Sequence, residues 1–223
     1  MTGDRVGASR LCSPVKRVKT AGVPPTNAVT LGLSPHSGWA ALVAVGGSPA
    51  LPEVLVRARI ELADPSLPGS RQPYHALEEL PLAEAERRLR RYESTARSMA
   101  RAGLASIVDE LRRGGHAAAA AGILESSGRK GRSLEAILAS HALIHTADGD
   151  HFRDALAEAG AHCGLVVHRV SARDLVDKAT AALRLSEQDI QARVRELGRP
   201  LGPPWTADQK SAAMLAWSLL ISR

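Results

Sequence analysis

Two histidines on one predicted helix have the spacing of a transition-metal site. His141 and His145 are four positions apart, and Asp148 follows one turn later. Residues four apart lie on the same face of a helix, so both imidazoles could bind one ion. The glutamate of the zinc-binding pattern H-E-x-x-H is missing. The alternative, which we favour here, is that both histidines are partly buried where the helix packs on a sheet.

A short basic loop could bind phosphate groups. Residues 126–132 read Ser-Ser-Gly-Arg-Lys-Gly-Arg. Guanidinium and ammonium groups on such a loop can reach phosphates while backbone N–H groups assist them. We therefore predict nucleic-acid contacts for Arg129, Lys130 and Arg132, the alternative being a solvated connector. The loop is not a nucleotide-binding P-loop, because the pattern G-x-x-x-x-G-K-[ST] is absent.

The charge of the chain restricts nucleic-acid binding to local clusters. Its 29 Lys and Arg residues exceed its 23 Asp and Glu residues, which gives a formal net charge of +6. Residues 1–26 contain five basic residues and one acidic residue, so four of the six charges belong to them. We predict that residues 1–26 form a flexible basic arm and that residues 27–223 form one domain. An aromatic content of 3% argues against a protein that stacks single-stranded bases.

The cysteines and the apolar runs exclude several classes of protein. Cys12 and Cys163 are the only cysteines, which fits neither a disulfide framework nor a four-ligand zinc site. No apolar run approaches the roughly 18 residues of a membrane helix. Residues 1–26 lack the apolar core of a signal peptide. We expect a soluble, cytoplasmic protein without a membrane partner.

The hydrophobic pattern predicts an α/β domain that positions these groups. Apolar or alternating runs at 28–33, 39–45 and 53–62, separated by Gly- and Pro-rich turns, predict three antiparallel strands. Further strands are predicted at 117–124 and 165–170. Helices are predicted from 82 to 113, over 133–163, and after 170 apart from residues 198–204. The predicted fold is therefore a five-stranded mixed sheet, three antiparallel strands followed by two parallel ones, flanked by helices.

Several segments, in the same order along the chain, resemble one family of nucleases. Residues 31–37 read Leu-Gly-Leu-Ser-Pro-His-Ser, and residues 122–125 read Gly-Ile-Leu-Glu. They are similar to the first strand (Leu-Gly-Ile-Asp-Pro-Gly-Ser) and to the end of the fourth strand (Ala-Ile-Glu) of the RuvC family of Holliday-junction resolvases. Weaker similarities follow at 140–143, 147–149, 165–167 and 208–215. The resemblance extends from about residue 27 to residue 222 and implies an RNase H-like fold.

The resemblance also implies an active site in which one ligand is replaced. Nucleases of this fold hold two Mg²⁺ ions with carboxylates from the first strand, the fourth strand and the last helix. The first-strand position is Ser34, whose neutral hydroxyl contributes little to binding a hard cation. Glu125 occupies the second position, and Asp208 lies about one turn before the third. We predict a degenerate site with Glu125 and Asp208 as its catalytic and metal-binding residues, for Mg²⁺ or Mn²⁺ if it is active.

Both carboxylates also have an ordinary structural interpretation. Glu125 could simply end a strand at the surface. Asp208 lies near the start of the last predicted helix, where the helix dipole favours a carboxylate.

Three functional hypotheses follow. The first is a RuvC-like protein that binds branched or duplex DNA and has lost or weakened its metal-dependent cleavage. The second is an active Mg²⁺- or Mn²⁺-dependent endonuclease that uses Glu125, Asp208 and a relocated acid such as Asp148 or Asp150. The third is a scaffold domain without a nucleic-acid partner or a cofactor. Under the first two we expect a homodimer, because a four-way junction has two symmetric cleavage points.

Overall fold

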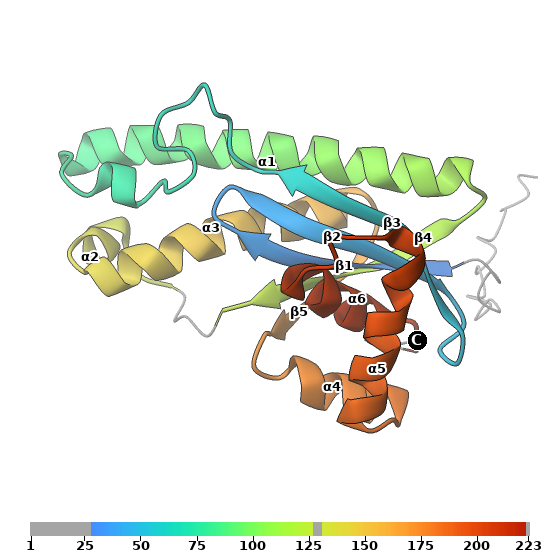
Figure 1. Ribbon diagram of the computed structural model, residues 1–223. Coiled ribbons are helices and arrows are strands. Elements are labelled where there is room, and N and C mark those ends of the chain that lie inside the picture. Colours follow the sequence, from blue (N-terminus) through green and yellow to red (C-terminus); the bar gives the residue numbers. More distant parts are fainter. Residues whose placement is uncertain (1–27, 127–130, 222–223) are drawn as a thin grey trace, which may run out of the picture.

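The computed structural model describes residues 28–126 and 131–221, which are built around one twisted sheet (Figure 1). The strand order is β3–β2–β1–β4–β5. The strands β1 (Ala28–His36), β2 (Trp39–Gly47) and β3 (Pro52–Glu61) are antiparallel neighbours. The strands β4 (Ala117–Glu125) and β5 (Val166–Ser171) run parallel to β1. The predicted sheet, three antiparallel strands followed by two parallel ones, is confirmed.

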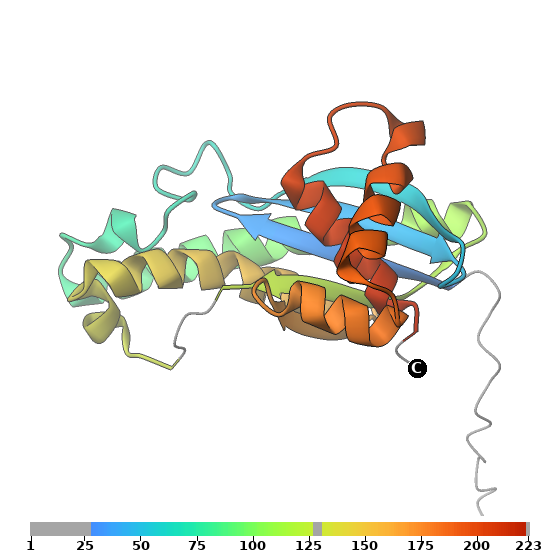
Figure 2. The ribbon, with the colours of Figure 1, turned by 60° about the horizontal axis from the view of Figure 1, so that its bottom comes forward.

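Helices cover both faces of the sheet (Figures 1 and 2). One face carries α1 (Leu82–Arg113) and α3 (His141–His162), which close a hydrophobic core with β1 and β4. The other face carries α4 (Leu175–Leu183), α5 (Glu187–Leu197) and α6 (Ala207–Leu219), which close a second core. The short helices η1 (His75–Leu77), α2 (Leu134–Leu138) and η2 (Arg199–Leu201) lie in the connections. Among the described helices, none is long and apolar enough to cross a membrane.

One predicted helix is in fact two. The helix predicted over 133–163 is interrupted at Ala139 and Ser140, which separate α2 from α3. Ala139 is the C-cap of α2, and Ser140 stands at the N-cap position of α3 with extended backbone angles, φ −143° and ψ 112°, so the helical geometry is interrupted there. The two helices pack on different clusters: Leu134 and Leu138 of α2 pack against the cluster that contains Leu77 and Tyr92, whereas Phe152 and Leu156 of α3 pack in the core with β1 and β4. The predicted basic arm, residues 1–26, lies outside the described residues.

The closest contact between the two layers joins α6 to the middle of β1. Gly32 lies so near α6 that a Cβ atom there would be 1.9 Å from the carbonyl oxygen of Ala212. Two residues earlier, Thr30 donates a hydrogen bond from Oγ1 to the carbonyl oxygen of Ala216, at 2.6 Å. The absence of a side chain at Gly32 therefore allows the backbones to touch. This contact places Asp208, one helical turn before Ala212, over the carboxyl end of β1.

Candidate functional site

The carboxyl end of β1 brings Ser34 and Asp208 together. Ser34 is buried on the face of the sheet that α6 covers, and its Oγ donates a hydrogen bond to Asp208 Oδ1 at 3.3 Å. His36 lies at the end of the same strand, with Nε2 2.8 Å from the same carboxylate oxygen. One carboxylate oxygen of Asp208 thus contacts both a hydroxyl group and an imidazole.

The ring of His36 packs on Trp39, and Arg59 packs on the Trp39 ring in turn. Its ring is stacked on Trp39 with centroids 4.4 Å apart and planes 11° from parallel. The guanidinium carbon of Arg59 lies 3.9 Å from the centroid of the Trp39 ring, in cation–π geometry. Sequence reasoning missed His36 as a site residue, because its partner Asp208 lies 172 positions away and no local spacing connects them.

This arrangement is not a nucleophilic relay. In a Ser–His–Asp triad the imidazole lies between the serine and the carboxylate and takes the serine proton. Here the hydroxyl of Ser34 and the imidazole of His36 both contact Asp208 directly. Ser34 therefore contacts a carboxylate and not the imidazole that serves as the base in such a triad, and its hydroxyl orients that carboxylate.

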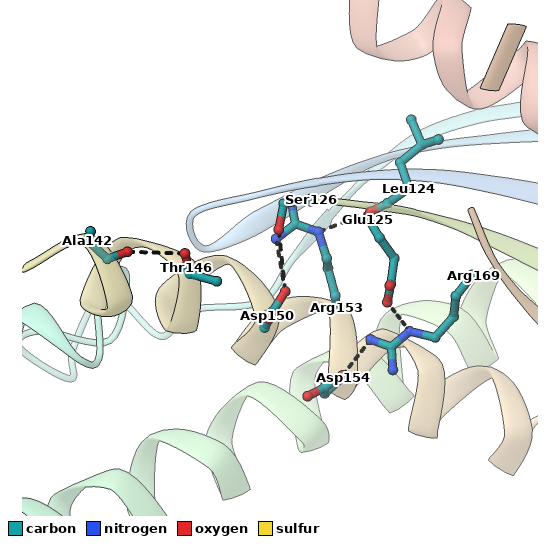
Figure 3. Close-up of polar contacts among 9 residues, drawn as sticks. All are labelled: Leu124, Glu125, Ser126, Ala142, Thr146, Asp150, Arg153, Asp154 and Arg169. Atoms are coloured by element: carbon teal, nitrogen blue, oxygen red, sulfur yellow. Dashed lines mark hydrogen bonds and ion pairs between the residues drawn. The ribbon is translucent and has the colours of Figure 1, made fainter. Parts of the chain in front are cut away.

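Glu125 belongs to the opposite face of the sheet. Side chains alternate along a strand, and in β4 the residue Ile123 packs in the core under α1 and α3, whereas Leu124 packs in the core under α6. Glu125 follows Ile123 onto the α3 side, where its carboxylate is paired with Arg169 of β5 (Figure 3). Arg169 is also paired with Asp154 of α3. The structure therefore brings Asp208 to Ser34 and directs Glu125 away from both.

The register of the two parallel strands explains this separation. Gly32 is paired with Gly122, and Leu33 with Ile123. Continuing this register places Leu124, not Glu125, opposite Ser34. A displacement of one residue moves a side chain to the other face of a sheet. Glu125 lies one position too far along the strand to face the same way as Ser34.

A second group of charges surrounds Glu125 on the α3 side (Figure 3). The half-buried guanidinium of Arg153 donates from Nε to the carbonyl oxygen of Leu124 at 3.0 Å and lies 3.8 Å from Asp150 Oδ1. Burial lowers the pKa of Arg153, while the carboxylates of Asp150 and Glu125 act in the opposite direction. Two arginines, Arg153 and Arg169, thus lie among the carboxylates of this group.

Asp148, one of the two candidate relocated acids, has a different partner. It is buried and accepts hydrogen bonds from the backbone N–H of Tyr74, at 2.7 Å, and from Nδ1 of His75. Burial raises the pKa of Asp148, although these two hydrogen bonds lower it. Asp148 therefore faces the loop that contains η1. The other candidate, Asp150, lies in the arginine-containing group described above.

Part of the predicted basic loop is described. Arg129 and Lys130 lie outside the described residues, whereas Arg132 is exposed. Together with Arg97 of α1 and Asp150 and His151 of α3, Arg132 lines a cavity of about 230 Å³. Burial lowers the pKa of His151 to about 4. The loop thus meets a pocket that contains both basic and acidic side chains.

The residues present do not fit the two-metal centre of nucleases with this fold. That centre requires carboxylates from three elements around one pair of ions. Here Ser34 is neutral, Asp208 contacts Ser34 and His36, and Glu125 is paired with Arg169 on the other face. In the parts of the chain that the structure describes, no group of three or more potential metal ligands includes Glu125 or Asp208.

The element order and the sheet order define an α/β protein with a five-stranded mixed sheet flanked by helices, as the sequence predicted. No protein-family model and no curated protein sequence matches this chain.

Two solved structures of RuvC are similar in fold. One is RuvC of Thermus thermophilus in complex with a Holliday junction substrate, with a TM-score of 0.49 and 13% identity over 87% of this chain and 93% of that one. The other is RuvC of Thermus thermophilus without a stated ligand, with a TM-score of 0.46 and 16% identity over 85% and 92% of the two chains. Both structures are named as RuvC, the family that segments of this sequence resemble.

Proposed function

We propose that this protein binds nucleic acid, with branched or duplex DNA as the class of partner, and does not cleave it by two-metal chemistry. The observation that carries the proposal is the environment of Asp208. At the position where an acid would bridge two ions, Ser34 instead donates a hydrogen bond to this carboxylate, and His36 contacts the same oxygen. A hard divalent cation prefers several anionic oxygens, and this site offers one carboxylate.

Clustered arginines support the binding half of the proposal. The helix α1 contains eight arginines and five acidic residues. A groove on its outer surface is lined by Arg90, Glu93, Ser94, Arg97, Ser98 and Arg101. Arg97 and Arg101 are paired with the two oxygens of a single carboxylate, Glu158, so this pairing leaves an excess of positive charge. Arginines and hydroxyl groups along one groove are the groups that contact phosphate backbones.

Arg132, the described basic residue of the loop predicted from the sequence, adjoins this surface. Arg132 lines the same cavity as Arg97, which connects the loop with α1. We include Arg129, Lys130 and Arg132 in the proposed binding surface. A homodimer remains part of the proposal, because a four-way junction has two symmetry-related positions at which two copies can bind.

A binding and cleavage assay on one sample tests both parts of the proposal, namely that the protein binds nucleic acid and that it does not cleave it. Labelled four-way junction and linear duplex are titrated with the protein at several salt concentrations, with Mg²⁺ or Mn²⁺ present, and the products are separated under native and denaturing conditions. We expect binding that weakens with salt and no cleavage. Each lost phosphate contact should reduce the slope of log affinity against log salt by about 0.9.

Charge-matched variants locate the surface. Arg97→Ala and Arg132→Ala should weaken binding and reduce the salt slope, whereas Arg113→Ala, an exposed arginine at the far end of α1, should not. Light scattering on the complex reports whether two copies are bound. Absence of binding at low salt overturns the binding half of the proposal, and cleavage by the wild-type protein overturns the other half.

A further inference from the structure

Three histidines from two distant segments form one cluster. His75 in η1 joins His141 and His145 in the first turns of α3, and one ring nitrogen from each lies within 4.8 Å of the others. The Nε2 atoms of His141 and His145 are 3.1 Å apart. The ring of His75 lies edge-on to both, with centroids 5.4 Å from His141 and 4.5 Å from His145. In the described part of the chain this is the one group of three or more potential ligands close enough to hold an ion.

A buried carboxylate orients one of these rings. Asp148 is 3% exposed and accepts a hydrogen bond from Nδ1 of His75, so that nitrogen carries the proton. The other ring nitrogen of His75 is then unprotonated and able to bind a metal. The backbone N–H of Tyr74 holds the same carboxylate at 2.7 Å. A carboxylate behind a histidine is the usual outer partner of a metal-binding imidazole, because it fixes the tautomer and the ring orientation.

We propose that His75, His141 and His145 bind one Zn²⁺ ion, with Asp148 as the positioning residue behind His75. Three neutral imidazoles favour a borderline transition metal over Mg²⁺ or Ca²⁺, which prefer oxygen ligands. With Zn–N distances of about 2.0–2.1 Å, tetrahedral geometry places two ligand nitrogens about 3.3 Å apart. The 3.1 Å between His141 and His145 is already close to that value. Modest side-chain rotation would complete the site.

The cluster lies where an ion can enter from solvent and where a bound ion would connect two segments of the chain. His141 and His145 are exposed, so the site opens to solvent, and three protein ligands leave the fourth coordination position to water. The bound ion would link η1 to the start of α3, two segments 66 positions apart in the chain. This site does not include Ser34, Glu125 or Asp208, and it does not depend on the proposed nucleic-acid binding.

The sharpest test is a titration of the full chain, without a polyhistidine tag, after removal of metals with a chelator. Co²⁺ is added as a spectroscopic probe near neutral pH, and Zn²⁺ binding is measured by calorimetry and by competition with Co²⁺. We expect one ion per chain, the visible absorption bands of tetrahedral cobalt, and their loss when Zn²⁺ is added. Zn²⁺ should also raise the unfolding temperature, because it binds only the folded cluster.

Variants distinguish this site from adventitious binding. His145→Ala removes an exposed ligand and should abolish the cobalt bands and the thermal response. Asp148→Asn should weaken binding by about 10- to 100-fold while the bands persist, as expected for a positioning residue. His162→Ala, an exposed histidine at the other end of α3, is the matched control and should bind as the wild type does.

Two outcomes would overturn the proposal. The first is a wild-type chain that binds no Co²⁺ or Zn²⁺ more tightly than His145→Ala does. The second is a loss of metal binding in His162→Ala that is as large as the loss in His145→Ala. Because the ring of His145 is exposed, its removal should leave the fold intact, and circular dichroism in the presence of chelator verifies this.

Discussion

Replacing Ser34 with aspartate tests the reasoning about the site at the end of β1. The substitution restores the acid that nucleases of this fold carry, but it places a second carboxylate beside Asp208. The Oγ atom of Ser34 lies 3.3 Å from Asp208 Oδ1, so the two negative charges would be about 4 Å apart. Without a cation between them, this repulsion should destabilise the folded state.

The size of the effect follows from that separation. Two unit charges about 4 Å apart interact by about 4 kcal/mol at an effective dielectric constant of about 20. The side chain of Asp208 is 33% exposed, and His36 contacts it, so solvent and the imidazole screen part of the repulsion. We expect Ser34→Asp to lower the free energy of unfolding by about 2–3 kcal/mol more than Ser34→Asn, which has nearly the same size and no charge.

Urea denaturation at low ionic strength measures this difference. Tryptophan fluorescence follows unfolding, first in chelator and then in Mg²⁺ or Mn²⁺. A divalent cation would neutralise the two carboxylates, so Ser34→Asp should recover stability while Ser34→Asn should not respond. Equal stability of the two variants in chelator would refute the reasoning, because it would mean that Asp208 does not lie beside position 34.

Two further predictions concern packing and pH. Gly32→Ala should lower the free energy of unfolding by about 3 kcal/mol or more in urea denaturation, since its Cβ would lie 1.9 Å from a backbone oxygen of α6. Gly114→Ala should cost much less, since φ is −77° there and the atom nearest to its Cβ is a side-chain carbon of His116 at 3.3 Å. Burial lowers the pKa of His151 to about 4, below the value of about 6.5 expected for unfolded imidazole. The unfolded state therefore binds more protons between these values, and stability should fall by up to about 3 kcal/mol as the pH drops from about 6.5 to about 4. His151→Leu should lose this part of the pH dependence, and an unchanged slope in urea denaturation at several pH values would contradict the assignment.

The elements of the fold could be predicted from the sequence because their patterns are local. The alternation in β3 and the helical stripe of α1 each repeat within a few residues, and burial of one face requires that repeat. The order of the elements then limits the connections that a sheet allows. That Ser34 stands where the resembled family has an acid was likewise visible in a segment of seven residues, 31–37.

The composition of the site could not be predicted in this way. Whether Glu125 faces Ser34 depends on the parity of the β1–β4 register, which becomes visible only once both strands are paired. That His36 contacts Asp208 depends on how closely α6 approaches Gly32.

The histidine cluster shows the same division. The spacing of His141 and His145 was evident in the sequence. The third histidine of the cluster, His75, lies in η1, which meets the start of α3 only in the folded structure. The sequence by itself determined the elements, because short-range periodicity specifies them, and it shows directly that position 34 is a serine. Only the tertiary structure decided which side chains meet, because contacts between distant segments are set by strand register and by the packing of helices on the sheet.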